Sequence, residues 1–409
     1  MQILYIPVFK KSGIQSALAC ILPVIFLFQP GISNAWQVLS CLENVSPTDA
    51  ILLADHDGNI IYKKNERKKC IPASTLKLLT ALTAIRKFGG AYRFKTEFYL
   101  DPCRNLKIKG YGDPLLISEV WQKIADILAE KIGNFEELLL DDTWFSQHMV
   151  IPGRNGSANP YDAPAGALCA NFNTVFFDFD GKAGIITAEP QTPLIPFAKK
   201  KIRSLGLKKG RNTFIHDSKE AARYAGELLL RFLKDRGVEC KGGIRFCAVE
   251  PDDKLLFTYR SDFSLEEVLQ KMLKFSNNFI ANQLFIALGA QAYGAPGTPD
   301  KGIRVITEFA KKDLRLGDIE IAEGSGISRK NRLSALQMLD ILKQFEPYRR
   351  LLNRKKTALY KTGTLNGIRT RAGYIERDNK GPYYFVIFFE QTETDIDSLI
   401  DCITAALKK

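Results

Sequence analysis

The most constraining feature of this chain is an apolar stretch from residue 72 to residue 85 that holds a single charged side chain. The stretch predicts a helix with apolar residues on nearly every side, which is typical of a buried helix. The charge belongs to Lys77, three positions after Ser74, so the amine and the hydroxyl share one helical face. Burial disfavours the ammonium form, and unpaired N–H groups at a helix start favour developing negative charge. The pair therefore predicts an activated serine.

Two further short motifs carry side chains that suit the same chemistry. Ser276-Asn277-Asn278 lies between two predicted helical stretches, and Lys361-Thr362-Gly363 ends a predicted strand. The Ser-x-x-Lys and Ser-x-Asn patterns each occur by chance in a chain of this length, so neither is specific by itself. Their order along the chain and their structural settings together favour one assembled site. The alternatives are an incidental helix pair, a helix cap at Ser276 or Asn278, and a plain strand end.

The predicted roles follow from the chemistry of these groups. Ser74 attacks a carbonyl carbon while Lys77 accepts its proton, and backbone N–H groups of Ser74 and Thr364 form the oxyanion hole. Ser276 and Asn278 relay protons and hold the substrate backbone. Lys361 and nearby threonine hydroxyls bind a substrate carboxylate, and a glycine lets substrate approach the strand edge. The predicted catalytic residues are Ser74, Lys77, Ser276, Asn278 and Lys361, and the predicted substrate-binding residues are Thr362, Gly363 and Thr364.

Longer segments around these motifs match a known family. The chain resembles the penicillin-binding protein 4 type of D-alanyl-D-alanine carboxypeptidase/endopeptidase, the class C low-molecular-mass penicillin-binding proteins. The resemblance extends over nearly the whole chain after the first 35 residues. It is carried by residues 71–81, 110–115, 141–145, 160–164, 171–173, 273–278, 324–334, 361–365 and 372–374.

The resemblance implies an α/β (α+β) fold: a transpeptidase/β-lactamase-like domain, with an antiparallel sheet flanked by helices, interrupted by an inserted mixed α/β region. It also implies that peptidoglycan stem peptides ending in D-Ala-D-Ala, and β-lactam antibiotics, acylate Ser74. Two departures stand out. Ser276 follows Ser74 by 202 positions, fewer than in the fullest family members, which is consistent with a trimmed insertion. Glu323 stands where the family commonly has Asp, a change that keeps the charge.

Hydrophobic patterning predicts one domain assembled from both ends of the chain. Near the N-terminus, Asp57-Gly58 marks the turn of a hairpin. Near the C-terminus, the pattern predicts strands at 358–361, 370–376 and 383–389 and an amphipathic helix at 395–407. The stretch between is rich in Gly and Pro and has predicted helices at 119–132 and 219–235. We therefore predict a signal peptide at 1–35, a catalytic domain at 36–96 and 256–409, and an inserted region at 97–255.

The first 35 residues are typical of an export signal. Lys10 and Lys11 precede an apolar run from Ile14 to Phe28, and small residues follow at 33–35. Retention as an uncleaved anchor is the alternative. No later stretch is expected to span a bilayer, so we predict no stable membrane span after processing. The predicted location is the bacterial periplasm or cell envelope.

Cysteine and histidine usage limits the cofactors and disulfides. Seven cysteines follow the signal, so at least one stays free or pairs between chains. Export permits disulfides, and Cys240 and Cys247 would close a small loop, but the sequence leaves the connectivity open. There is no Cys-x-x-Cys pair, and the three histidines lack the spacing of metal ligands. We therefore predict no structural zinc site, and the serine mechanism requires neither a metal nor an organic cofactor.

The formal net charge of +13 indicates a general attraction to anionic surfaces. Basic clusters lie at 67–69, 199–201 and 354–356. The chain has no helix-turn-helix, finger or aromatic-interleaved basic motif, so no nucleic-acid partner is expected.

Together these patterns predict an exported serine DD-peptidase that works through a Ser74 acyl-enzyme. It would cleave D-Ala-D-Ala termini as a carboxypeptidase, D-amino cross-links as an endopeptidase, or both. The alternatives are a β-lactamase or esterase on the same fold and a non-catalytic peptidoglycan-binding envelope protein. The sequence leaves open the cleavage preference, the third residue of the stem peptide and the oligomeric state.

Overall fold

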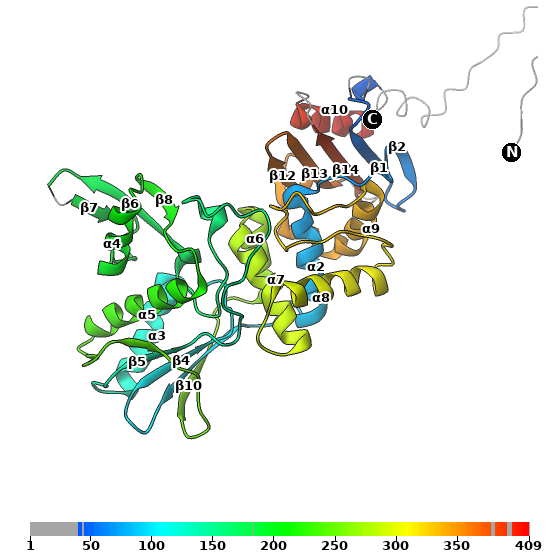
Figure 1. The fold of residues 1–409 in the computed structure, drawn as a ribbon. Helices are drawn as coiled ribbons and strands as arrows, with labels where there is room; N and C mark the ends of the chain where they lie inside the picture. Colours follow the sequence, from blue (N-terminus) through cyan, green and yellow to red (C-terminus); the bar gives the residue numbers. More distant parts are fainter. Residues whose placement is uncertain (1–39, 43–44, 183, 378–380, 391–394, 409) are drawn as a thin grey trace, which may run out of the picture.

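The computed structural model describes residues 40–42, 45–182, 184–377, 381–390 and 395–408. The predicted export signal at 1–35 lies outside the described residues. The structure has two bodies with separate sheets (Figure 1). The chain crosses between them twice, at 89–94 and at 261–264, and α6 (Leu265–Lys274) and α7 (Asn278–Tyr293) follow the second crossing. One body combines both ends of the described chain, and the other is formed by its middle (Figure 1).

The first body is built on a six-stranded antiparallel sheet, which confirms the predicted sheet. Apolar runs such as that of residues 383–389 are buried on both faces of this sheet. In spatial order its strands are β11 (Asn353–Lys355), β12 (Ala358–Leu365), β13 (Ile368–Ile375), β14 (Tyr383–Glu390), β1 (Ala50–Ala54) and β2 (Ile60–Lys64).

Helices cover both faces of this sheet. The amphipathic C-terminal helix α10 (Ile396–Lys408) packs Ile400 and Ile403 against side chains such as Ile387 on one face. On the other face α9 (Ala335–Phe345) contacts β14 and β1. Beyond it lie the central helix α2 (Lys77–Phe88) and its neighbours α6 (Leu265–Lys274), α7 (Asn278–Tyr293) and α8 (Pro299–Lys312), with the short helix η4 (Glu346–Leu351).

The stretch predicted as one helix over residues 72–85 is divided in two. A 3-10 turn, η1 (Ala73–Leu76), contacts β12 and β13 and leads directly into α2. Ala73 has a φ of 47°, in the left-handed region that disfavours residues with a Cβ. The left-handed residue therefore stands at the start of the turn that holds Ser74, and the turn continues without a break into the helix that begins at Lys77. Burial of nearly the whole stretch confirms its prediction as a core element.

The second body contains two smaller sheets. The five-stranded sheet has the order β10 (Lys254–Arg260), β3 (Lys95–Leu100), β4 (Leu106–Gly110), β5 (Leu138–Asp141) and β9 (Ile244–Phe246). It is accompanied by α3 (Ser118–Lys131) and α5 (Ser218–Lys234), close to the predicted helices. The three-stranded sheet has the order β7 (Gly184–Thr187), β6 (Thr174–Asp180) and β8 (Gly210–Thr213), next to α4 (Pro196–Ser204). The short helices η2 (Pro160–Asp162) and η3 (Asn171–Asn173) complete this part.

β3, where the chain enters the second body, pairs with β10, where the chain leaves it. The predicted limits of the inserted region, residues 97 and 255, therefore fall inside these two strands. We propose that the inserted region begins with β3 and ends with β10.

One disulfide joins Cys41 to Cys402 of α10, 361 positions apart in the sequence. The suggested pair between Cys240 and Cys247 is wrong, because both thiols are free. Within the described residues Cys70, Cys103 and Cys169 are free as well.

Across the part of the chain that the structure describes, every helix is too short or too polar to cross a membrane.

Candidate active site

Ser74 lies in a tight turn that the surrounding packing holds in place. The backbone carbonyl of Pro72 accepts hydrogen bonds from the Thr75 hydroxyl at 2.6 Å and from the Thr370 hydroxyl of β13 at 2.8 Å. These bonds tie the turn to the sheet. They support the left-handed conformation of Ala73, which costs free energy and persists only where its surroundings enforce it.

Lys77 lies one residue beyond the turn, completely buried, with its amine facing the serine. Its Nζ is 3.0 Å from Ser74 Oγ, 2.7 Å from Asn278 Oδ1 and 2.7 Å from the backbone oxygen of Ser325. Burial, and then the nearby charge of Lys361, hold the pKa of Lys77 well below its usual range, against an opposing effect of Glu323.

A neutral amine matches these three neighbours. It donates its two N–H groups to the oxygens of Asn278 and Ser325, and its lone pair then faces the hydroxyl of Ser74. The arrangement can accept the serine proton while the oxygen attacks a carbonyl carbon.

A second amine lies on β12. Lys361 Nζ donates to Ser276 Oγ at 2.9 Å and to the backbone oxygen of Thr362 at 2.7 Å. Burial, and then the charge of Arg371, lower the pKa of Lys361 to about 7. Lys77 and Lys361 thus each contact one member of the Ser276–Asn278 motif.

The segment between α6 and α7 aims that motif at the two lysines. Ser276 has a φ of 52°, which turns the chain between the helices. The residue that caps α7 is Asn277, whose Oδ1 accepts from the N–H of Ile280 at 3.0 Å. Ser276 and Asn278 are therefore left to contact the lysines, and the helix-cap alternative applies to their neighbour instead.

Residues 361–364 alternate along β12 as a strand requires. Lys361 and Gly363 are buried, whereas Thr362 and Thr364 are exposed. A Cβ on Gly363 would collide with Thr370 Oγ1 and would lie 2.8 Å from Ser74 N. The structure thus gives a reason for this glycine that the sequence did not suggest, namely the close packing of β12 on the serine turn.

The loop after α8 supplies the third partner of Lys77. The buried carboxylate of Glu323 accepts hydrogen bonds from Ser325 N and Oγ, both at 2.6 Å, from Gly326 N at 2.7 Å and from Asn331 Nδ2 at 2.7 Å. These bonds shape the loop so that the carbonyl of Ser325 points to the amine. The family resemblance includes residues 324–334 of this loop, but sequence reasoning missed the carbonyl, because a backbone oxygen leaves no pattern in the sequence.

Gly326 brings the same loop onto the serine turn. It has a φ of 85°, and a Cβ there would collide with the backbone oxygen of Ala73. The serine turn is therefore held between this loop and β12.

All three histidines are exposed. Among the described residues, no three His, Cys, Asp or Glu side chains are grouped in a way that could hold a metal ion.

A serine activated by a buried lysine, on an antiparallel sheet flanked by helices, defines a serine-type hydrolase. The model of the D-Ala-D-Ala carboxypeptidase 3 (S13) family matches residues 49–208 and 204–355, and the chain belongs to that family. This finding confirms the family that the sequence resembles.

Individual relatives agree with this family. A D-alanyl-D-alanine carboxypeptidase of Actinomadura sp. (strain R39) is 26% identical over 335 aligned positions, which cover 70% of this chain and 62% of the relative. The D-alanyl-D-alanine carboxypeptidase DacB of Haemophilus influenzae is 23% identical, and the alignment covers 95% of each chain.

Solved structures show the same fold. The crystal structure of penicillin-binding protein 4 from Haemophilus influenzae superposes with a TM-score of 0.73 at 20% identity, covering 90% of this chain and 98% of that one. A penicillin G-acylated endopeptidase, Bd3459 of Bdellovibrio bacteriovorus in complex with its immunity protein, gives a TM-score of 0.51 at 17% identity, covering 88% of each chain.

Proposed function

We propose that this protein is a serine DD-peptidase in which Ser74 forms the acyl-enzyme. The observation that carries the proposal is the 3.0 Å approach of Lys77 Nζ to Ser74 Oγ inside a buried network, where burial lowers the pKa of the amine. Membership of the D-Ala-D-Ala carboxypeptidase 3 family supports a peptide ending in D-Ala-D-Ala as the substrate.

Acylation begins when Ser74 Oγ attacks the carbonyl carbon of the penultimate D-Ala and its proton moves to Lys77 Nζ. The backbone N–H groups of Ser74 and Thr364 would stabilise the oxyanion of the tetrahedral intermediate. The C–N bond then breaks, and the departing amine takes up the proton that Lys77 accepted, with Ser276 as the proposed relay, so the amine of Lys77 is neutral again and Lys361 keeps its charge. Water later attacks the ester and gives its proton to Lys77, and this proton returns to Ser74 Oγ when the ester breaks.

The substrate carboxylate is assigned to the exposed strand edge of β12. Lys361 supplies the positive charge, and the hydroxyls of Thr362 and Thr364 are exposed and can donate to the carboxylate. Asn278, held by Lys77, is placed to bind the substrate backbone. An endopeptidase reaction uses the same steps, with a cross-linked D-amino centre in place of the free D-Ala.

The same nucleophile would open a β-lactam ring. The amine that departs stays tethered to the acyl group, so the ester persists unless water is admitted quickly. A long-lived adduct distinguishes the peptidase from a β-lactamase, which would turn penicillin over rapidly.

We further propose that the enzyme acts in the bacterial cell envelope on peptidoglycan stem peptides. The substrate class of the family and the export signal predicted at 1–35 support this location. No nucleic acid is expected to take part, and the oligomeric state is left open.

The test is release of D-Ala from a soluble acyl-tripeptide ending in D-Ala-D-Ala. Wild type should release it, Ser74→Ala should not, and the exposed Ser398→Ala on α10 should match wild type. A Ser74→Ala variant that still releases D-Ala would overturn the assignment of the nucleophile. A folded wild type that binds cell-wall peptides but releases nothing would support the non-catalytic alternative. Digestion of cross-linked muropeptides separates endopeptidase from carboxypeptidase activity.

A further inference from the structure

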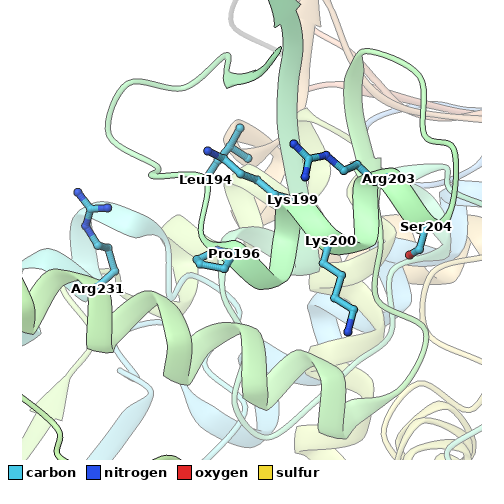
Figure 2. A pocket seen from close by; sticks show the side chains of 7 residues that line it. All are labelled: Leu194, Pro196, Lys199, Lys200, Arg203, Ser204 and Arg231. Carbon is cyan, nitrogen blue, oxygen red and sulfur yellow. The ribbon is translucent and has the colours of Figure 1, made fainter. Parts of the chain in front are cut away.

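An open groove of about 720 Å³ lies between α4 and α5 of the inserted region, away from the serine turn. Cationic side chains reach it from both helices (Figure 2). Lys199, Lys200 and Arg203 come from α4, and Arg231 comes from α5. None of the residues that line the groove is acidic.

Most of this charge is not neutralised by the protein. Within the described residues, the charged groups of Lys199, Lys200 and Arg203 lie farther than 4.0 Å from every carboxylate. Lys201, which follows Lys200, instead forms an ion pair with Glu220. The guanidinium of Arg231 is partly engaged, because its Nε contacts Asp235 at 3.0 Å. Three unpaired cations within two turns of one helix repel each other, and an anionic partner would relieve that repulsion.

The surrounding segment is basic as well. Residues 174–213, which contain the three-stranded sheet and α4, hold eight Lys and Arg against three Asp and Glu. This tenth of the chain therefore supplies +5 of a formal net charge of +13. It creates a positive field around the three-stranded sheet and α4, which lie at the left of Figure 1, away from β12.

We propose that this groove binds carboxylates of peptide chains in polymeric peptidoglycan and so holds the enzyme on its insoluble substrate. The inference rests on the proposed function, because a wall bearing many peptides with free carboxylate ends is a polyanion. Ammonium and guanidinium groups form charge-assisted hydrogen bonds with carboxylates. A concave site suits a chain segment better than a bilayer, and Leu194 and Pro196 are the apolar residues among those that line it.

The test compares two variants with equal loss of charge. The groove variant combines Lys199→Gln, Lys200→Gln and Arg203→Gln. The control variant combines Lys131→Gln, Lys254→Gln and Lys311→Gln, which replace exposed lysines that form no ion pair within the described residues. Glutamine keeps the helix propensity of the replaced residues.

Binding is measured by co-sedimentation with purified sacculi at low ionic strength. We expect the groove variant to bind at least fivefold more weakly than wild type and the control, and wild type to lose binding when the sacculus carboxylates are converted to amides. Equal binding by both variants, or undiminished binding of wild type to amidated sacculi, would overturn the proposal. So would a groove-dependent loss seen only with anionic phospholipid vesicles.

Hydrolysis of the soluble acyl-tripeptide separates this proposal from the proposed function. All three proteins should hydrolyse it at the same rate, since the groove is remote from Ser74. If wild type fails on the soluble peptide, the proposed function fails. If only the sacculus comparison fails, the groove proposal alone is wrong.

Discussion

Replacing Gly363 with alanine tests the packing that places the nucleophile. The new methyl group would collide with Thr370 Oγ1 and would lie 2.8 Å from Ser74 N and 3.0 Å from Ala73 Cβ. Ordinary contacts between such atoms are about 3.5–4.0 Å, so β12 and the serine turn must separate by about 1 Å. The interior is densely packed, so the displacement is transmitted to Ser74 rather than absorbed.

Overpacking of this size costs about 1–3 kcal/mol of unfolding free energy. A misplacement of about 1 Å at a reacting group costs about a hundredfold in rate. We therefore expect Gly363→Ala to lose about two orders of magnitude in the rate of acylation by a fluorescent penicillin, with a modest loss of stability.

The matched control is Gly243→Ala, because a Cβ at Gly243 meets no atom within 4 Å. This variant should acylate at the wild-type rate. Stopped-flow acylation and urea unfolding measure the two quantities. A Gly363→Ala protein with wild-type acylation kinetics would show that the contact between β12 and the serine turn does not position the nucleophile.

Three further predictions concern charge and cross-linking. The pKa of Lys361 is about 7, and only its ammonium form binds a carboxylate, so kcat/KM for a D-Ala-D-Ala peptide should fall about tenfold per pH unit well above neutrality. The methyl ester of the same peptide has no carboxylate and serves as the control. A pH profile with no such fall, or an equal fall for the ester, would contradict this prediction. Glu323→Ala leaves several buried hydrogen-bond donors unpaired, at a cost of about 1–3 kcal/mol each. The free energy of unfolding, measured in urea, should therefore fall by about 3 kcal/mol or more. An unchanged unfolding midpoint would refute the role of the carboxylate. Replacing Cys41 and Cys402 with serine should lower the free energy of unfolding by about 2–4 kcal/mol, measured by thermal unfolding. The rate of acylation should stay unchanged, because the disulfide lies on the side of the sheet away from Ser74, and a slower acylation would contradict this.

The parts of the site that depend on local geometry could be predicted from the sequence. The spacing of Ser74 and Lys77 places their side chains together whatever the rest of the fold does, and the apolar stretch around them required burial. The strands and helices at both ends of the chain were predictable for the same reason, since their hydrophobic periods are long and clear.

The parts that depend on contacts between distant segments could not be predicted. The left-handed Ala73 results from packing against Gly326 and Gly363, and nothing in the sequence near Ala73 indicates it. The carbonyl of Ser325 is a backbone group. The pairing of Cys41 with Cys402 requires the two chain ends to meet in one sheet body.

The central claim is that the buried amine of Lys77 makes Ser74 the acylated residue. Its most direct test is mass spectrometry of the protein after exposure to benzylpenicillin, with peptide mapping of the adduct in wild type and in Lys77→Ala. We predict one stoichiometric adduct on the peptide that contains Ser74, absent from Lys77→Ala. An adduct on another residue, or equal labelling without the lysine, would contradict the claim.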